Sequence, residues 1–412
     1  MKVNRRDFLA TSVGAALLQT PTNAQLPSPN AISALPDYEK PLFQLHQHFS
    51  NPVKIASIEL LRNGNNYFVR SVSTDGAIGI APTKQVEDFI PILLRRVIPF
   101  FIGKDARDLE SLIDGVYIQN YKMAEQAFWC PVAYVEQSLL DLLGKQARKP
   151  VGELLGGVLR RKIPVYLSGS GRDTTAEEEV EVYVRAVEAT GTKAVKFKIG
   201  GRMSRNADAT PGRTERMMQL ARKRLGDQVT LYADANGSYN AKKGIEVGKF
   251  LESLNVAFFE EPCPWEELGE TKRVADALTI PIAAGEQDAS LWRFQWMIEN
   301  RVIDIVQCDL NYNGGLIRAA RVARMARQAN MTIVPHNTQT GITGAYILQF
   351  ASCIPNTGKR MEYPWRKPEN KPSWYSPHFE IKQGVIDVPT GPGLGVEIDP
   401  DFLNKATRVQ AC

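Results

Sequence analysis

Side chains capable of acid, base and metal chemistry recur at nearly regular intervals in the second half of the chain. From Asp234 onward, successive members are 26, 26, 23, 27 and 26 positions apart. Each also ends a short apolar run rich in β-branched or aromatic residues. One strand, one helix and two short loops fit this spacing, which predicts a parallel (β/α) barrel with a functional group at the carboxyl end of each strand. The set consists of Lys196 with Lys198, Asp234, Glu260, Glu286, Asp309, His336 and Glu362.

Three carboxylates of this set predict a metal site. Asp234, Glu260 and Glu286 would lie at the ends of three successive strands, and three like charges do not stay ionised in one pocket without a cation. Oxygen donors of this kind, completed by water and substrate, suit Mg²⁺. Glu261 directly follows Glu260, and neighbouring strand residues point to opposite sides. The strand pattern alone therefore leaves open which of the two is the ligand.

Two lysines and an Asp/His pair predict proton transfer. Lys196 and Lys198 are two positions apart and so lie on one side of their strand. Positive charge beside a lysine lowers its pKa, which lets one of the pair, next to a metal, act as a base at neutral pH. Asp309 and His336 would lie at the ends of adjacent strands, where the carboxylate can orient the imidazole and raise its basicity.

Eight strands are needed to position these groups, and a smaller module precedes them. Alternating runs between Lys54 and Ile80, separated by the turn signals Asn63–Asn66 and Asp75-Gly76, predict an antiparallel meander. From Val86 to about Leu155 the pattern turns helical. The predicted barrel strands are Pro164–Leu167, Ala194–Lys198, Thr230–Asp234, Ala257–Glu260, Pro281–Gly285, Asp304–Cys308, Thr332–Pro335 and Lys359–Met361.

Over about residues 53–400, the chain resembles the enolase superfamily and, within it, the mandelate racemase subgroup. The resemblance implies an α/β fold, a (β/α)7β modified TIM barrel with an N-terminal α+β capping domain. It rests on Lys196-Phe197-Lys198, Asp234-Ala235-Asn236, Glu260-Glu261-Pro262, Gly285-Glu286, Asp309 with Gly314-Gly315, His336-Asn337 and Glu362, in this order. Ser138–Lys145, Leu154–Gly157 and the terminal Val388–Gly395 fit as well.

Five segments are expected from these patterns. They are a twin-arginine signal peptide at 1–24, an irregular arm at 25–52, the capping domain at 53–158, the barrel at 159–383, and a C-terminal segment at 384–412 that returns to the cap.

The resemblance also implies a role for each residue. Glu260, rather than Glu261, would bind Mg²⁺ together with Asp234 and Glu286. Lys198 would remove or return the proton next to a substrate carboxylate that Lys196 helps to hold.

On the other face of the substrate, Asp309 would orient His336, which commonly protonates a departing β-hydroxyl in the dehydratases of this subgroup. Glu362 would be protonated and would donate a hydrogen bond to the enolic oxygen opposite the metal. Asn236 would contact a substrate hydroxyl.

These roles imply abstraction of a proton next to the carboxylate of a small-molecule substrate. Dehydration of an acid sugar to a 2-keto-3-deoxy acid is expected, because it is the commoner activity in the subgroup. A racemase or epimerase of a 2-hydroxy acid is the alternative, since bases on both faces permit it. A second alternative, an exported sugar-acid binding protein without catalysis, should lack one of the functional side chains, and all are present.

Composition and charge narrow the class of protein. The chain has 412 residues and a formal net charge of +5, with Lys and Arg spread along its length, so a nucleic-acid partner is not expected. Its five cysteines are scattered and include no CxxC pair, which argues against a disulfide framework or a zinc site. Relatives are often symmetric assemblies, so a homo-oligomer is expected.

The N-terminus predicts export. Asn4-Arg5-Arg6-Asp7-Phe8-Leu9 precedes an apolar stretch and then Thr22-Asn23-Ala24, a pattern that resembles a twin-arginine signal cut before Gln25. The apolar stretch from Leu9 to Leu18 is too short for a membrane span, and no later run qualifies. The expected location is the periplasm.

Two departures from the family pattern concern the substrate. The hairpin from Leu61 to Phe68 has a four-residue turn where relatives usually carry a longer loop over the site, and the arm is extra. The hypothesis is that Phe43, His46, His48 or Phe49 covers the mouth of the barrel in its own or a neighbouring subunit. The substrate would then be selected in the hairpin and the arm.

Overall fold

The computed structural model describes residues 40–169, 171–365 and 372–410. The predicted signal peptide, the part of the predicted arm before residue 40, and the last two residues lie outside the described residues. Within the described part of the chain, no helix is both long and apolar enough to cross a bilayer.

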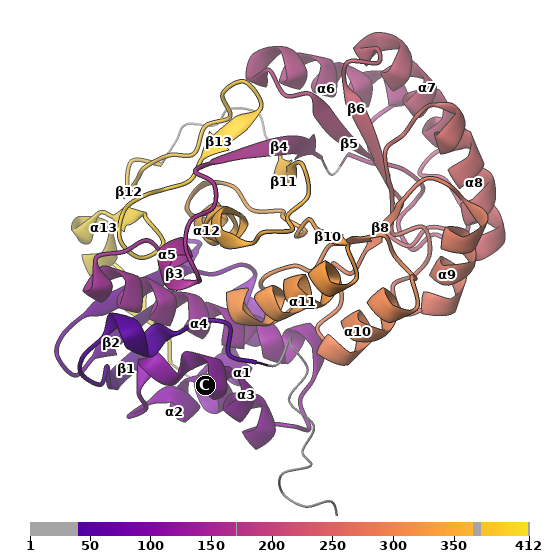
Figure 1. The fold of residues 1–412 in the computed structure, drawn as a ribbon. Coiled ribbons are helices and arrows are strands. Elements are labelled where there is room, and N and C mark those ends of the chain that lie inside the picture. Colours follow the sequence, from indigo (N-terminus) through magenta and orange to yellow (C-terminus); the bar gives the residue numbers. More distant parts are fainter. Residues whose placement is uncertain (1–39, 170, 366–371, 411–412) are drawn as a thin grey trace, which may run out of the picture. The chain divides into compact units, whose positions relative to one another are not determined.

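Eight parallel strands form the barrel (Figure 1). Their hydrogen-bonded order is β10-β9-β8-β7-β6-β5-β4-β11, and a parallel bridge between Ile333 in β10 and Thr357, just before β11, joins the two ends. Seven strand–helix units precede the last strand, so the predicted fold class is confirmed. The strands are β4 (Lys162–Ser168), β5 (Ala194–Lys198), β6 (Thr230–Asp234), β7 (Phe259–Glu260), β8 (Ile282–Ala284), β9 (Ile305–Val306), β10 (Thr332–Ile333) and β11 (Met361–Pro364).

A helix follows each of the first seven strands, and Figure 1 shows α6 to α11 along the outside of the barrel. Thr175 and Glu178 form a reciprocal capping box at the start of α6, which ends at Gly191 in the left-handed conformation. Asn240 and Ser290 cap α8 and α10 through their side-chain oxygens. The helices are α6 (Ala176–Thr190), α7 (Arg213–Leu225), α8 (Ala241–Ser253), α9 (Leu268–Ala277), α10 (Leu291–Glu299), α11 (Leu316–Gln328) and α12 (Ala345–Cys353).

The strand boundaries match the prediction at β5 and β6 and differ most at the last strand. The sequence predicts a strand over Lys359–Met361, whereas β11 starts at Met361 and continues to Pro364. Met361 and Glu362 pair in register with Val165 and Tyr166 of β4. Glu362 therefore lies inside its strand rather than after it.

An antiparallel sheet and several helices form the cap. The sheet order is β15-β1-β2-β3, and Gly64 and Gly76, with φ of 59° and 89°, make the two turns of the predicted meander. The strands are β1 (Ile55–Asn63), β2 (Asn66–Ser73), β3 (Ile78–Pro82) and β15 (Thr407–Arg408), and the helices are α1 (Ile90–Ile92), α2 (Ile98–Phe101), α3 (Leu109–Gln119), α4 (Glu125–Ala147) and α5 (Val151–Leu154).

Helix α4 connects the cap to the barrel. Every residue of α4 from Phe128 to Gly144 is buried. The Glu136 carboxylate accepts a hydrogen bond from the backbone N–H of Leu316 at 2.5 Å, at the first turn of α11. This contact satisfies an N–H group that the helix itself leaves without a partner.

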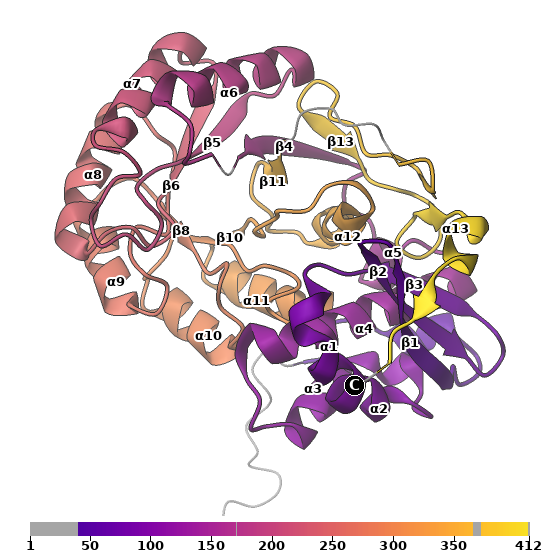
Figure 2. The ribbon, with the colours of Figure 1, turned by 180° about the vertical axis from the view of Figure 1, so that it is seen from behind.

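The C-terminal segment runs back to the cap, as Figure 2 shows from behind. Leu394 N–H donates to Asp141 of α4 at 2.8 Å, and β15 pairs with β1 through Arg408 and Leu61. Along this segment lie β13 (Val385–Asp387), β14 (Glu397–Ile398) and α13 (Pro400–Asn404), and β14 pairs with β12 (Tyr375–Ser376), which precedes the segment. β13 pairs with β4, so the segment contacts the barrel and the cap in turn.

The cap sheet packs closely against α4 at Gly79 of β3. A Cβ at Gly79 would meet the carbonyl oxygen of Ser138 and the backbone nitrogen of Leu142, and backbone atoms cannot move aside as a side chain can. We expect Gly79→Ala to lower the free energy of unfolding by about 1–3 kcal/mol. Gly269→Ala is the control, since nothing lies near its Cβ position. Equal urea midpoints for the two variants would contradict the contact.

Candidate active site

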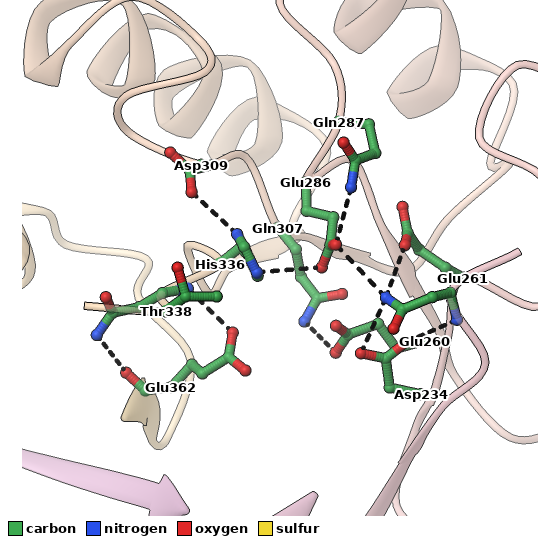
Figure 3. A network of polar contacts seen from close by, with 12 residues as sticks. Asp234, Glu260, Glu261, Glu286, Gln287, Gln307, Asp309, His336, Thr338 and Glu362 are labelled. Atoms are coloured by element: carbon green, nitrogen blue, oxygen red, sulfur yellow. Dashed lines mark hydrogen bonds and ion pairs between the residues drawn. The ribbon is translucent and has the colours of Figure 1, made fainter. Parts of the chain in front are cut away.

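Three carboxylates meet at the ends of neighbouring strands (Figure 3). Asp234 ends β6, Glu260 ends β7, and Glu286 follows β8 by two residues. One oxygen from each lies within 4.8 Å of the other two. All three side chains are buried. The structure thus brings together the three residues predicted as metal ligands.

Glu261 reaches the same pocket because the chain leaves the strand directly after Glu260. Its φ of 39° is in the left-handed region, so the alternation of a strand no longer applies to it. Asn236, two residues beyond Asp234, has φ of 41°, and its Nδ2 donates to Glu261 Oε2 and to Asp234 Oδ2, both at 3.3 Å. Burial and the charge of Glu286 raise the pKa of Glu261.

Arg172 fixes the orientation of Asn236. Its Nη1 donates to Asn236 Oδ1 at 3.0 Å, and its other nitrogens donate to the backbone carbonyls of Gly200 and Ile199. With its oxygen occupied, Asn236 directs Nδ2 at the carboxylates, including Glu286 at 3.5 Å. Asn236 also lines the cavity, and its contact with a substrate hydroxyl stays a prediction.

Lys196 lies at the centre of the barrel and has no exposed surface. Its Nζ is 2.5 Å from Glu260 Oε1, 2.7 Å from Glu362 Oε1 and 3.6 Å from Asp234 Oδ2. Burial alone would lower the pKa of Lys196, but these carboxylates outweigh it and the pKa is raised. Lys196 is not among the residues that line the cavity, so it is placed to act on the carboxylates rather than directly on a substrate.

Lys198 lines the cavity and forms an ion pair with Asp234. The sequence predicts a lowered pKa for this lysine. Burial does lower the pKa of Lys198, but the Asp234 carboxylate outweighs burial and the net direction is upward. Lys196 does lower the pKa of Lys198, as predicted, but the Asp234 carboxylate acts more strongly in the opposite direction. The prediction also counts the positive charge of a bound metal.

Asp309 and His336 form the predicted pair. His336 Nδ1 is 2.9 Å from Asp309 Oδ2, and Asp309 Oδ1 accepts the backbone N–H groups of Asn311 and Tyr312 at 2.7 and 3.0 Å. His336 Nε2 is 3.6 Å from Glu286 Oε2. Burial lowers the pKa of His336, but Glu286 and Asp309 raise it more, so the net direction is upward.

The two candidate acid–base groups face each other across the barrel. Lys198 ends β5 and His336 follows β10, and these strands are separated by β6 to β9 in one direction and by β4 and β11 in the other. Both side chains line the same cavity. A substrate between them would present opposite faces to the two groups.

Glu362 differs from its predicted state. The sequence predicts a protonated carboxyl, and burial favours one. Lys196 and His336, however, lower the pKa of Glu362 more than burial raises it. Glu362 Oε2 also accepts the backbone N–H of Asn337 at 3.0 Å, so the carboxylate is the favoured form in this structure.

The cavity at the barrel mouth has a volume of about 450 Å³, which suits a small metabolite. Within the described part of the chain, all of its lining residues belong to the barrel and none to the cap. Besides the residues discussed above, the loops after five strands contribute Arg202, Met203, Trp265, Gln287, Thr338 and Trp365.

The described part of the arm lies on the cap helices instead of over this mouth. Glu110, near the start of α3, accepts the backbone N–H of Phe43 at 2.8 Å, His46 is 2.7 Å from Asp108, and His48 is 3.3 Å from Lys149. None of these arm residues, nor Phe49, lines the cavity. The hypothesis that they cover the mouth of their own subunit is therefore wrong for residues 40–52.

Four side chains outside the predicted set support the site. Gln307 donates to Glu260 Oε2 at 2.7 Å. Because Gln307 lies two residues before Asp309, strand alternation could have predicted that both face the same side. Arg172, Gln287 and Lys84 lie on loops or in the cap, where no periodic pattern marks them. Lys84 is 3.0 Å from Asp309.

The carboxylates fit a magnesium ion. Their donor atoms are all hard oxygens, the type that Mg²⁺ prefers. Glu286 Oε2 is buried and accepts no hydrogen bond within the described part of the chain, since its contact with His336 Nε2, at 3.6 Å, is too long for one. A buried carboxylate oxygen is costly to leave without a partner, so this atom in particular favours a bound cation.

Lys196 should contribute more to stability than a surface lysine or arginine does. We expect Lys196→Met to cost about 3–5 kcal/mol of unfolding free energy with a chelator present, because it leaves buried carboxylates uncompensated. The raised pKa of Lys196 keeps this contribution intact below the ordinary lysine pKa, and the lowered pKa of Glu362 keeps it intact above the ordinary glutamate pKa, so pH 7 suits the measurement.

Arg185→Met is the matched control, since it removes an exposed pair with Glu181 and should cost at most about 1 kcal/mol. Chemical denaturation measures the unfolding free energy of both variants. Equal losses of unfolding free energy would contradict the central role of Lys196 in stability.

Comparison with known proteins identifies a family model and a set of similar proteins. The model of the enolase C-terminal domain-like family matches residues 178–402. Arabinonate dehydratase of Saccharolobus solfataricus is 28% identical over 334 residues, which cover 79% of this chain and 86% of that protein. Further curated relatives at 26–28% identity are named D-gluconate dehydratase, D-mannonate dehydratase and D-galactarolactone cycloisomerase.

Solved structures share the fold. A mandelate racemase/muconate lactonizing protein from Paracoccus denitrificans, complexed with magnesium, is 28% identical with a TM-score of 0.81 and covers 87% of this chain and 100% of its own. A protein from Roseobacter denitrificans that is proposed to be a racemase is 36% identical with a TM-score of 0.82 and covers 86% and 99%. The family model spans more than half of the chain, and the predicted resemblance is confirmed: this protein is an enzyme that belongs to the enolase superfamily, in its mandelate racemase group.

Proposed function

We propose that this enzyme removes the proton next to the carboxylate of an acid sugar and eliminates the β-hydroxyl as water, in a Mg²⁺-dependent reaction that yields a 2-keto-3-deoxy acid. The observation that carries the proposal is the placement of Lys198 and His336 on opposite sides of one cavity, beside three buried carboxylates. The names of the curated dehydratases support the acid-sugar class.

Asp234, Glu260 and Glu286 are the residues that would hold the ion. Bound there, Mg²⁺ would supply positive charge for the negative charge that develops on the substrate carboxylate when the α-proton leaves. Gln307 and Asn236 orient these carboxylates through hydrogen bonds of 2.7 and 3.3 Å.

Lys198, in its neutral form, is the proposed base. A cation held by Asp234 would favour this form, because it would offset the carboxylate charge that raises the pKa of Lys198. Lys198 Nζ takes the α-proton, and the electrons of the broken C–H bond delocalise into the substrate carboxylate. They then form the bond between the α and β carbons as the β C–O bond breaks. His336 Nε2 donates a proton to the departing hydroxyl, which leaves as water. The resulting enol gains a proton at the β carbon and becomes the 2-keto acid.

Glu362 and Lys196 would serve the carboxylate end of the substrate. Glu362 lines the cavity, and the 2.7 Å contact between Lys196 Nζ and Glu362 Oε1 places a proton between them. We infer that this proton passes from Lys196 to Glu362 as negative charge develops on the enolic oxygen. Glu362, then protonated, donates a hydrogen bond to that oxygen, while Lys196 becomes neutral and remains buried behind it.

Racemisation or epimerisation is the second candidate. The same opposed pair, Lys198 and His336, would allow one group to remove the α-proton and the other to return it on the opposite face. A curated relative named as a cycloisomerase supports isomerase chemistry. The elimination and the inversion share their first step and differ in the fate of the β-hydroxyl.

Proton exchange in deuterated water distinguishes these candidates. The full-length protein is incubated with Mg²⁺ and a panel of aldonates and aldarates, and NMR follows deuterium at the α carbon together with the 2-keto product. For the correct acid we expect a keto product, with Lys198→Ala and His336→Asn each at least about 100-fold slower. Lys193→Ala, at an exposed lysine just before β5, is the control and should retain the wild-type rate.

The other outcomes are equally informative. Deuterium exchange without keto product would replace the dehydratase by the racemase or epimerase. No exchange with any acid of the panel would contradict both and would favour a binding protein.

Magnesium should stabilise the fold independently of activity. Mg²⁺ at 100 times its dissociation constant would add about 2.7 kcal/mol of unfolding free energy. We expect this gain to disappear in Asp234→Asn and to persist in Asp227→Asn, whose carboxylate is 85% exposed. Thermal unfolding with and without Mg²⁺ measures it. A gain of equal size in both variants would show that the ion binds elsewhere.

A further inference from the structure

Lys84 is a buried cation that the cap directs at the catalytic barrel. It lies between β3 and the next helical turn of the cap and is only 7% exposed. Its Nζ is 3.0 Å from Asp309 Oδ2, a residue 225 positions further along the chain. Within the described part of the chain, Asp309 is its ion-pair partner.

The main chain and an aromatic ring hold Lys84 in place. Tyr134 of α4 donates its hydroxyl to the backbone carbonyl of Lys84. The ammonium group lies 4.1 Å from the centroid of the Tyr312 ring, a cation–π contact. Tyr312 lines the cavity and Lys84 does not, so Lys84 acts from behind the wall of the site.

Every side of the Asp309 carboxylate is occupied. Oδ1 accepts two backbone N–H groups, as described above, and Oδ2 is shared by His336 Nδ1 at 2.9 Å and Lys84 Nζ at 3.0 Å. Burial alone would raise the pKa of Asp309, but Lys84 is the first of the groups that lower it, and the net direction is downward. Lys84 thus keeps the Asp309 carboxylate ionised and fixed in place, while the same carboxylate oxygen contacts the His336 imidazole.

We propose that Lys84 is a positioning residue for His336. By holding Asp309 Oδ2 in place, Lys84 fixes the ring orientation that aims His336 Nε2 into the cavity. This inference rests on the proposed function only for the step that His336 performs. The capping domain would then govern one half of the proton chemistry without touching the substrate.

Two substitutions separate the role of Lys84 from simple structural damage. Lys84→Met keeps the length of the side chain and removes the charge, and Lys84→Arg restores a donor. Lys145→Met is the control, because it removes another lysine of the cap, paired with Asp141, that lies outside the proposed catalytic site.

The kinetic readout compares the two faces of the reaction. In Lys84→Met we expect formation of the keto product, which needs His336, to fall by about 10–100-fold. Deuterium exchange at the α carbon through Lys198, and KM, should change less than about threefold. Lys84→Arg should recover most of the product rate, and Lys145→Met should match the wild type. Equal losses of product formation and exchange would overturn the proposal.

A second measurement does not depend on the reaction. The chain has four histidines, so ¹⁵N-labelled histidine gives few side-chain signals, and His336→Asn identifies the one that belongs to His336. We expect a protected Nδ1–H signal in the wild type and in Lys84→Arg, and its loss in Lys84→Met. An unchanged signal in Lys84→Met would overturn the inference even if no acid sugar were turned over. Loss of the signal in a protein without turnover would support it and contradict only the proposed function.

Discussion

Negative charge gathered in a buried space is the constraint on which the rest of this structure depends. The oxygens of Asp234, Glu260 and Glu286 lie within 4.8 Å of one another, where two unit charges repel by about 3.5 kcal/mol even at an effective dielectric constant near 20. Glu261 adds a fourth carboxyl group to the same pocket. The ion pairs of Lys196 and Lys198 reduce this repulsion by placing positive charge beside the carboxylates, and a divalent cation would reduce it further.

The cap supports the site at two places instead of covering it. Lys84 contacts Asp309 from one side, and Gln126, near the start of α4, donates to Gln287 Oε1 at 2.9 Å. Gln287 in turn donates to Glu286 at 3.0 Å. Within one subunit, the side chains that line the cavity come from the barrel, with Arg202, Trp265 and Trp365 on its loops, and none comes from the hairpin or the described part of the arm.

Regular spacing made the barrel and its strand-end residues predictable from the sequence. Each parallel strand delivers its last side chain to the same end of the barrel, so the spacing alone was enough to expect Asp234, Glu260 and Glu286 together. The last strand was placed too early, because Lys359 and Arg360 precede Met361 in a run whose apolar pattern is short. The side of the strand that Glu261 faces could not be predicted, because its left-handed backbone depends on the local turn.

The protonation states of the site residues were less predictable than their positions, because each state depends on the combined charge of many neighbouring groups. The ionised form of Glu362 follows from the closeness of Lys196 and His336, which no spacing reveals. Lys84 was missed for a related reason. Its partner lies in a different domain, and a lysine in a loop of the cap carries no pattern that points to a carboxylate of the barrel.

Lys196 has a consequence for the assembly of the barrel. Its ammonium group joins β5 to Glu260 on β7 and to Glu362 on β11, the last strand of the barrel in the chain. If any of these strands slipped by one residue, its side chains would turn to the opposite face, and a charge would be left in the core without a partner. The ion pairs at the centre of the enzyme therefore also favour the correct strand register, because they form together only when β5, β7 and β11 are aligned as observed.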